Sequence, residues 1–258
     1  RFAAAVYRPP VEKTDARFPL RLLTGRLRDQ WHGMSRTGTV ARLFNHAEEP
    51  LLTMSREDME RRGLRDGDLV RVRSRRSELV IGMQGSAEVR PGQVFLPMHW
   101  GSRFLAGTGV NGLTLEAFDP VSKQPELKHA AVSLEKAVLP WQMVVLRRGD
   151  VVRYMELVQP LLRRFGYAGA GLAGRNQPLM VLRVASAEPF STAAIAELDR
   201  LLEMDDDTRA LTYSDARRGI FKRVVAADGL VVAVRLTGEI AAYNWLKEAM
   251  DEGLSVDG

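Results

Sequence analysis

The sequence predicts a mainly β barrel followed by a small α+β domain. Three observations predict this: short strand-like segments fill the first part, only one short helix is expected among them, and helices alternate with strands after Pro140. Short strands joined by long polar loops favour a closed barrel over a βαβ sheet. We therefore expect a barrel domain at residues 1–140 and an α+β domain at residues 141–258.

The expected strands of the barrel are bounded by turn signals. Leu20–Thr24 is a short apolar run closed by Gly25, which predicts a buried strand that leads into a loop. A capping-box pattern begins at Ser55, so a short helix is expected at Ser55–Arg62, ended by Gly63. Alternation of apolar and charged residues predicts a half-buried strand at Leu69–Ser74. The other expected strands are Glu78–Met83 after the turn Arg75–Ser77, Gln93–Met98 after Pro91-Gly92, and Ala131–Leu134.

The second part contains a strong hairpin signal. Asp228-Gly229 separates two apolar runs, which predicts a type I′ turn. Thr237 is expected to cap a final helix, with Trp245 packed in the core. The segment Gly166–Gly174 predicts a glycine-rich loop, although it lacks the Gly-Lys-Ser/Thr ending of a phosphate loop. The other expected elements are strands at Met143–Leu146, Leu179–Ala185, Ile220–Val225 and Leu230–Leu236, and helices at Val151–Arg164 (kinked or ended at Pro160), Ser191–Leu202 and Glu239–Glu252.

Composition excludes several kinds of site. The chain has no cysteine, so this stretch forms no disulfide, thiolate nucleophile, zinc ribbon or iron–sulfur ligand. The four histidines lack the spacing of a helical metal site, and no protein-held metal is expected. No run approaches eighteen uncharged apolar residues, so no membrane span is expected. The chain opens at Arg1 without Met, and we interpret it as part of a longer protein.

Positive charge is concentrated in the first part of the chain. The formal net charge is +5, with 24 Lys or Arg against 16 Asp or Glu in residues 1–149 and 13 against 16 in the remainder. The first part therefore suits an anionic partner, although a solvated basic face is the alternative. Nucleic acid is not expected, because the arginines lie among Gly, Gln and Trp in turn-like segments.

The loop Arg26–Gly38 has the composition of an anion-binding segment. A strand ends at a glycine, the chain turns, and its amides become free to face an anion. Its three arginines each offer a planar fork to phosphate, and Trp31 and His32 offer flat faces to a heterocycle. The alternative is an arginine-rich surface loop with Trp31 buried in the core.

This loop carries a resemblance to a known family. Thr-Gly-Arg, Gln-Trp-His and Ser-Arg-Thr, within residues 24–37, resemble the C-terminal cofactor domain of molybdopterin oxidoreductases. Matching segments follow in order at Glu57–Ser77, Gly92–Trp100, Val110–Thr114 and Asp119–Lys128, so the resemblance covers roughly residues 15–135. Gln-Trp-His, Met-His-Trp and Lys-Gln-Pro-Glu-Leu-Lys are most similar to assimilatory nitrate reductases. The later Tyr213–Gly219 and Leu236–Leu246 segments resemble the tail of the same enzymes.

The resemblance implies a double-psi β-barrel that covers a molybdenum bis-molybdopterin guanine dinucleotide cofactor. It implies binding roles only, with no catalytic residue and no metal ligand in this chain. The protein orients such a cofactor, and the cofactor carries the chemistry. The implied cofactor-binding residues are Thr24, Gly25, Arg26, Gln30, Trp31, His32, Ser35, Arg36, His99, Trp100, Asn111, Gln124 and Lys128.

Some of these assignments have structural alternatives. His99 and Trp100 would serve equally well as packing at the barrel rim. Asn111 before a glycine is typical of a turn, Lys128 of a solvated charge, and Asp119-Pro120 of a turn rather than a ligand.

The resemblance also implies a parent enzyme that reduces nitrate to nitrite in the cytoplasm. Upstream domains of that enzyme would hold the metal ligand and an iron–sulfur cluster, an electron-donor protein would reduce it, and this chain alone would be inactive. Two alternatives stay open: the same domain of a formate dehydrogenase or another molybdopterin oxidoreductase, and a non-catalytic double-psi barrel adaptor module. An adaptor has no need of Arg, Gln, Trp and His in one loop.

Overall fold

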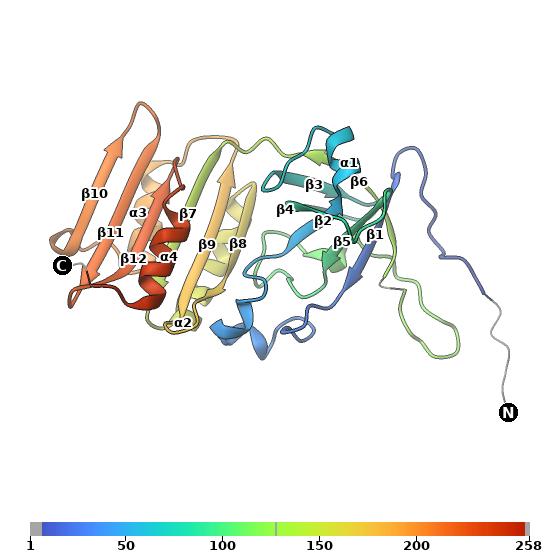
Figure 1. Cartoon of the computed structure of the whole chain (residues 1–258), viewed down its shortest axis with the longest axis horizontal. Coiled ribbons are helices and arrows are strands. Elements are labelled where there is room, and N and C mark those ends of the chain that lie inside the picture. Colours follow the sequence, from blue (N-terminus) through green and yellow to red (C-terminus); the bar gives the residue numbers. More distant parts are fainter. Residues whose placement is uncertain (1–6, 127, 256–258) are drawn as a thin grey trace. The chain divides into compact units, whose positions relative to one another are not determined.

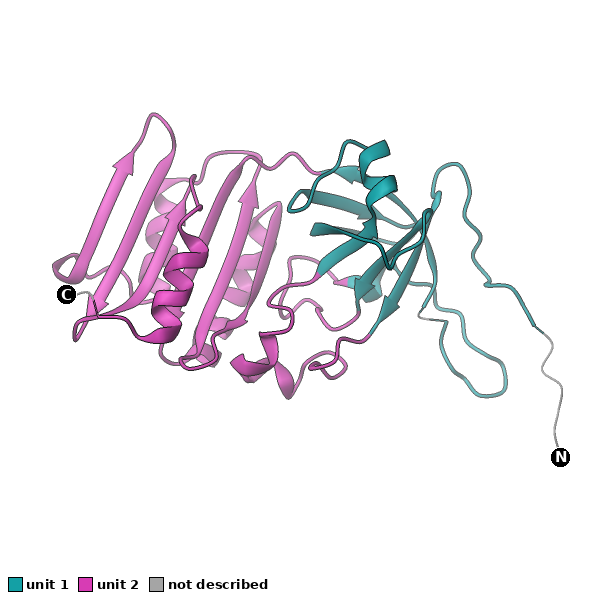
Figure 2. Ribbon diagram, in the orientation of Figure 1, with its two compact units in different colours: residues 1–25, 51–97, 110–136 teal, residues 26–50, 98–109, 137–258 magenta. Residues whose placement is uncertain are grey.

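The computed structural model describes residues 7–126 and 128–255 (Figure 1). The chain divides into two compact units, neither of which is continuous in sequence (Figure 2). The first unit comprises residues 1–25, 51–97 and 110–136. The second comprises residues 26–50, 98–109 and 137–258. The loops that follow the first and fifth strands therefore belong to the second unit.

The first unit is built on a closed six-stranded barrel, with strands in the order β1-β5-β2-β4-β3-β6. Two neighbouring pairs, β1 with β5 and β2 with β4, are parallel, and the other pairs are antiparallel. Alternate residues such as Leu20, Leu22, Val70 and Val72 fill its interior. The predicted barrel is confirmed. Its strands are β1 (Leu20–Gly25), β2 (Leu51–Ser55), β3 (Leu69–Arg73), β4 (Glu78–Ser86), β5 (Gln93–Pro97) and β6 (Ala130–Lys136).

The predicted N-cap at Ser55 is confirmed at the one α-helix found in the described part of this unit, α1 (Arg56–Arg61), whereas the Asp58 carboxylate accepts from the Gly92 amide at 2.6 Å. The Ser55 hydroxyl accepts a hydrogen bond from the Asp58 amide at 3.2 Å. Gly63 follows the helix with φ of +63°, as expected of a residue that ends it. Strand β2 was not predicted, because no turn residue separates it from the helix: its last residue, Ser55, is also the N-cap of α1.

The second unit is built on a six-stranded antiparallel sheet with strands in the order β10-β11-β12-β7-β9-β8. Figure 1 shows α4 in front of this sheet and α2 and α3 behind it. Asp228 and Gly229 have φ of +51° and +72°, which confirms the predicted type I′ hairpin. The elements are β7 (Trp141–Arg148), α2 (Val151–Val158), β8 (Tyr167–Ala173), β9 (Leu179–Ser186), α3 (Thr192–Leu201), β10 (Ala210–Asp215), β11 (Ile220–Ala227), β12 (Leu230–Thr237) and α4 (Tyr243–Glu252).

The glycine-rich loop expected at Gly166–Gly174 is wrong. This segment forms strand β8, all seven residues of which are buried. The apolar residues between its glycines pair with β9 along the whole strand. A strand that is buried on both faces shows no alternation of apolar and polar residues. The glycines were therefore the strongest signal in this segment, and they indicated a loop.

The expected start of the final helix and the expected burial of Trp245 are also wrong. Thr237 is the last residue of β12, and α4 begins after Ala242 without a side-chain cap. Leu246 and Met250 face the core, whereas Trp245 is 67% exposed. The helix predicted over Val151–Arg164 is α2 followed by a 3-10 turn that contains Pro160, and β10 was not predicted.

No helix in the described ranges is long and apolar enough to cross a membrane.

Candidate functional site

The site begins where β1 and β5 end side by side. The two strands run parallel, with Thr24 opposite Leu96 and Gly25 opposite Pro97. A Cβ atom on Gly25 would lie 2.9 Å from the ring of Phe95, so the absence of a side chain lets the two strand ends pack closely. Arg26 follows β1 and Met98 follows β5, so two loops begin at neighbouring strand ends.

His99 joins these two loops within the second unit. The Leu27 amide donates to Nε2 of His99 at 2.8 Å, and Nδ1 lies 2.7 Å from the carbonyl oxygen of His32. An amide can only donate, so Nε2 must accept and Nδ1 must carry the proton. Burial lowers the pKa of His99, with Arg26 acting in the same direction, although the His32 carbonyl opposes it. His99 is therefore a neutral imidazole whose ring nitrogens fix the shape of the first loop.

The exposed surface of the loop presents a stacked cation and two rings. The guanidinium carbon of Arg26 lies 4.9 Å from the centre of the Trp31 ring. Trp31 meets His32 edge to face, with ring centres 4.6 Å apart. Trp31 is 54% exposed, so the alternative that placed it in the core is wrong. A planar heterocycle with an attached anion would find both an aromatic face and a positive charge here.

The backbone of the loop is held in an unusual conformation. His32 and Met34 have φ of +44° and +58°, a region that residues other than glycine rarely adopt. The Met34 side chain is fully buried and anchors the turn. A Cβ on Gly38 would lie 2.7 Å from the Phe104 ring, so the loop packs tightly against the residues that follow Trp100. Such strain persists where the surroundings impose it, and it is typical of ligand-binding sites.

Gln30 lies beneath this surface with an unused acceptor. Its Nε2 atom donates to the Leu43 carbonyl at 3.0 Å, while Oε1 is buried without a hydrogen-bond partner among the described residues. A buried acceptor without a donor costs stability, so a ligand N–H or O–H at this point would be favourable. The predicted residues Ser35 and Arg36 are exposed on the same loop, and Arg36 adds a second cation to Arg26.

Arg28 differs from the other arginines of the loop. Its guanidinium makes two hydrogen bonds to the Asp29 carboxylate, at 2.8 and 2.9 Å. These bonds, followed by the charge of Asp29, raise the pKa of Arg28. Its positive charge is therefore balanced within the loop.

The predicted residues fall into two groups. Arg26, Trp31, His32, His99 and Trp100 are brought together in the second unit, and the last two rings lie 6.1 Å apart. Gln30, Ser35 and Arg36 belong to the same unit, whereas Thr24, Gly25, Asn111, Gln124 and Lys128 belong to the first.

In the first unit, Asn111 lies in a 3-10 turn and its carbonyl accepts from the Thr114 hydroxyl at 2.9 Å. Gln124 and Lys128 are exposed. The Asp119 carboxylate accepts from the Val121 and Ser122 amides at 3.0 and 2.7 Å, which confirms a turn. The cofactor contacts of the thirteen residues stay predictions.

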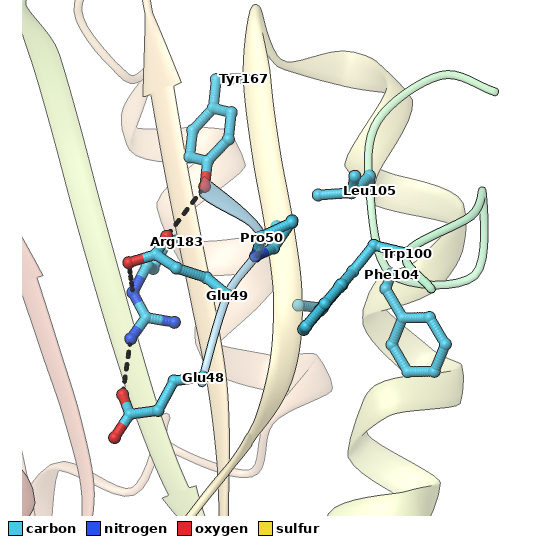
Figure 3. Close-up of a pocket in the computed structure, with 10 residues that line it drawn as sticks. Glu48, Glu49, Pro50, Trp100, Phe104, Leu105, Tyr167 and Arg183 are labelled. Atoms are coloured by element: carbon cyan, nitrogen blue, oxygen red, sulfur yellow. Dashed lines mark hydrogen bonds and ion pairs between the residues drawn. The ribbon is translucent and has the colours of Figure 1, made fainter. Parts of the chain in front are cut away.

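Sequence reasoning missed a polar cluster beside Trp100 (Figure 3). The Arg183 guanidinium pairs with Glu48 at 3.0 Å and Glu49 at 3.4 Å, and the Tyr167 hydroxyl donates to Glu49 at 3.2 Å. Burial raises the pKa of Tyr167. The adjoining cavity measures about 10 Å³, enough for a single water, so the cluster is a structural link and not a ligand pocket. No local pattern predicts it, because its members are far apart in the sequence.

Comparison with known proteins finds relatives for the first part of the chain. Residues 20–131 match the family described as "Molydopterin dinucleotide binding domain". Residues 20–131 are therefore similar to a molybdopterin dinucleotide-binding domain, over less than half of the chain. The chain is 39% identical over 151 residues to "Nitrate reductase" of Klebsiella oxytoca, a match that covers 58% of this chain and 17% of that protein. The chain thus corresponds to a small part of this relative.

A solved structure, "Acetylene Hydratase from Pelobacter acetylenicus", is 16% identical, with a TM-score of 0.36 over 46% of this chain and 18% of the other. That similarity is too low to inform fold or function.

The residues present fit a molybdopterin dinucleotide. The family match begins at Leu20 and contains β1, the loop Arg26–Gly38 and His99. The unused acceptor of Gln30 suits a pterin or base N–H, and the exposed Arg26 and Arg36 suit the phosphates that join the two halves of such a cofactor.

Proposed function

We propose that this chain is the C-terminal part of a molybdenum-dependent nitrate reductase, and that it holds one end of a bis-molybdopterin guanine dinucleotide cofactor. The observation that carries the proposal is the loop Arg26–Gly38, in which Arg26 stacks on an exposed Trp31 while the buried His99 fixes the backbone beneath them. The identity to a nitrate reductase supports the choice of substrate.

Each part of the loop has its own role in this proposal. Arg26 and Arg36 bind the phosphates through charge-assisted hydrogen bonds. Trp31 offers its face to the guanine or pterin ring, and the buried Oε1 of Gln30 accepts a hydrogen bond from a ring N–H. When bound, the molybdenum cofactor supplies the two-electron chemistry. The residues of this chain bind and orient it, exclude water from its covered side, and move no proton themselves.

The parent enzyme, on this proposal, carries the missing functions in its other domains. Those domains supply the metal ligand and an iron–sulfur cluster, so the 258-residue chain alone does not reduce nitrate. An electron-donor protein reduces the complete enzyme, which works in the cytoplasm in nitrate assimilation. Cofactor-binding roles are also proposed for Thr24, Gly25, Ser35, Trp100, Asn111, Gln124 and Lys128.

Calorimetric titration with GDP tests the proposed groove, because GDP carries a guanine and a pyrophosphate. We expect binding that weakens as salt rises, since screening reduces the attraction between the arginines and phosphate. Arg26→Ala removes the cation that stacks on Trp31 and should weaken binding by about tenfold or more, in line with the loss of a charge-assisted hydrogen bond. Guanosine, which lacks phosphate, should bind weakly to both proteins.

Arg28→Ala is the matched control. It lowers the charge of the same loop by the same amount, but it removes an arginine that is already paired with Asp29. Its affinity for GDP should stay within about threefold of that of the parent chain. An equal loss of GDP affinity in both variants would show that net charge alone attracts GDP. The absence of binding at millimolar GDP would contradict a preformed groove.

A further inference from the structure

The two edges of the second sheet differ in how they are covered. Along β8, the Ala106 amide donates to the Ala168 carbonyl at 2.9 Å and the Ala170 amide donates to the Phe104 carbonyl at 2.8 Å. An isolated β-bridge between Leu105 and Gly169 therefore covers part of that edge. At the opposite edge lies β10, and among the described residues its strand partner is β11 alone. Figure 1 shows β10 as the outermost strand of the sheet.

Strand β10 lacks the features that normally protect an exposed edge. Its sequence, Ala-Leu-Thr-Tyr-Ser-Asp, contains no Lys, Arg or Pro, and its pairing with β11 is regular over all six residues. Natural proteins place such residues or a bulge at open edges to prevent pairing with another chain. Leu211 is 78% exposed and Tyr213 is 54% exposed, although both favour a packed sheet surface.

Leu211 and Tyr213 lie on one face of the sheet. In the strand register Leu211 is level with Val224 and Val234, and Tyr213 is level with Lys222 and then Leu236. Val234 and Leu236 belong to the core that α4 covers, and Val224 packs against it. Helix α4 reaches β12 and β7, so the outer strand presents an uncovered apolar pair beside it.

The charges at the two ends of β10 complement each other in an antiparallel arrangement. Arg209 directly precedes the strand, where it also forms a partly exposed ion pair with Asp206 at 2.7 Å, and Asp215 ends the strand. Such an exposed pair contributes little, so Arg209 can exchange it for a carboxylate of a second copy. A twofold axis perpendicular to a sheet places one residue opposite its own copy. When that residue is Thr212, Leu211 lies opposite the second Tyr213 and Arg209 opposite the second Asp215. An axis at Leu211 or Tyr213 forms neither pair, so one register combines apolar contact with opposite charges.

We propose that two copies of this chain associate through β10, with the strands antiparallel around Thr212. The two six-stranded sheets then form one continuous sheet. Main-chain hydrogen bonds supply the attraction, and the Leu211–Tyr213 and Arg209–Asp215 pairs, each formed twice, set the register. The contact is small, because it involves one short strand from each copy, so the dimer should be dependent on concentration.

Sedimentation velocity over a concentration series tests the association. The chain has a mass of 28.8 kDa, and we expect the weight-average mass to rise toward twice that value with concentration. Hydrogen exchange of the β10 amides should slow over the same range, whereas the amides of β8 should not change. A monomeric mass at every concentration, or exchange of β10 that ignores concentration, would overturn the proposal and leave the edge open to a strand of another protein.

Charge reversal tests the register. Arg209→Glu places two acidic side chains together in the homodimer, and Asp215→Arg places two arginines together. Each variant should dimerise about tenfold more weakly than the parent, because two charge pairs become repulsive at once. An equimolar mixture of the two variants should regain dimerisation, because both contacts in the mixed dimer again join opposite charges.

Arg200→Glu, an exposed charge reversal near the end of α3, is the control and should not affect association. Circular dichroism and melting temperature establish that each variant folds, and Leu211→Lys provides a second disruption at a highly exposed position. Dimers that persist in both charge variants, or a mixture that stays monomeric while the parent dimerises, would contradict the proposed pairing.

Discussion

The imidazole of His99 is fully buried, yet both of its nitrogens are hydrogen-bonded to the backbone of the loop that carries Arg26 and Trp31. The geometry assigns it a positioning role, since neither nitrogen remains for a ligand. The predicted residues of this unit thus differ in kind. Arg26, Trp31 and Arg36 face solvent, whereas His99 acts through the shape that it gives to their loop.

Replacement of His99 by Leu should destabilise the chain by about 1–3 kcal/mol, because the Leu27 amide and the His32 carbonyl lose their partner. Urea unfolding measures this difference. Burial holds the pKa of His99 in the folded chain below the ordinary value of about 6.5, so the unfolded chain binds the proton first as the pH falls. The stability that His99 supplies is therefore complete above about pH 6.5 and declines below it.

The difference between parent and variant should accordingly shrink as the pH falls from 7.5 to 5.5. His46→Leu, at an exposed histidine of the same unit, is the control and should change stability little at either pH. A gap between parent and His99→Leu that widens in acid would contradict a neutral, hydrogen-bonded His99.

At the scale of elements, β8 shows how a glycine-rich segment can form the inside of a sheet. Its small residues let other parts of the unit approach closely. A Cβ on Gly171 would lie 3.2 Å from the carbonyl oxygen of Glu48 and 3.5 Å from the ring of Phe44. Gly171 is therefore required for close packing against Phe44 and Glu48, and not for flexibility.

Gly171→Val should destabilise the chain by about 1–3 kcal/mol, because the added side chain meets backbone atoms that cannot move aside. The melting temperature, followed by circular dichroism, measures this loss. Gly101→Ala is the control, since a Cβ there would meet no atom within 4 Å. An unchanged melting temperature for Gly171→Val would contradict a packed strand and support the loop that the sequence predicts.

At the scale of the whole molecule, the second unit depends on residues from the first half of the chain. Glu48 accepts from Arg183 at 3.0 Å, from the Tyr243 hydroxyl at 3.0 Å and from Lys247 at 2.6 Å. Burial opposes the charge of Glu48, but Lys247 and the other partners outweigh it and lower its pKa. This link lies entirely within the second unit, on both sides of the boundary expected at residue 140.

A fragment of residues 141–258 should therefore be less stable than the second unit in the whole chain. It would lose both carboxylates that pair with Arg183, and an unpaired buried guanidinium costs about 3–5 kcal/mol. It would also lose the segment that covers the edge of β8. Denaturant unfolding compares the two, with the double variant Glu48→Gln/Glu49→Gln of the whole chain as the control. A fragment as stable as the whole chain would support an independent domain that begins at residue 141.

Short-range patterns were sufficient for much of the fold. Short apolar runs bounded by turn residues located most strands of the barrel, Ser55 and Gly63 bounded α1, and Asp228-Gly229 fixed a hairpin, because each of these signals depends on residues that are close in the sequence. The same local composition marked the loop Arg26–Gly38 as an anion-binding segment.

Tertiary structure decided what depends on distant neighbours. Burial on both faces made β8 a strand, and the packing of Leu246 and Met250 in the core left the neighbouring Trp245 exposed on α4. The hydrogen bonds of His99 to the loop and the pairing of Arg183 with Glu48 join residues that are far apart in the sequence. The open edge of β10 follows from the order of the strands in the sheet. Such contacts exist only after strands are paired and faces are assigned, so no local period or motif encodes them.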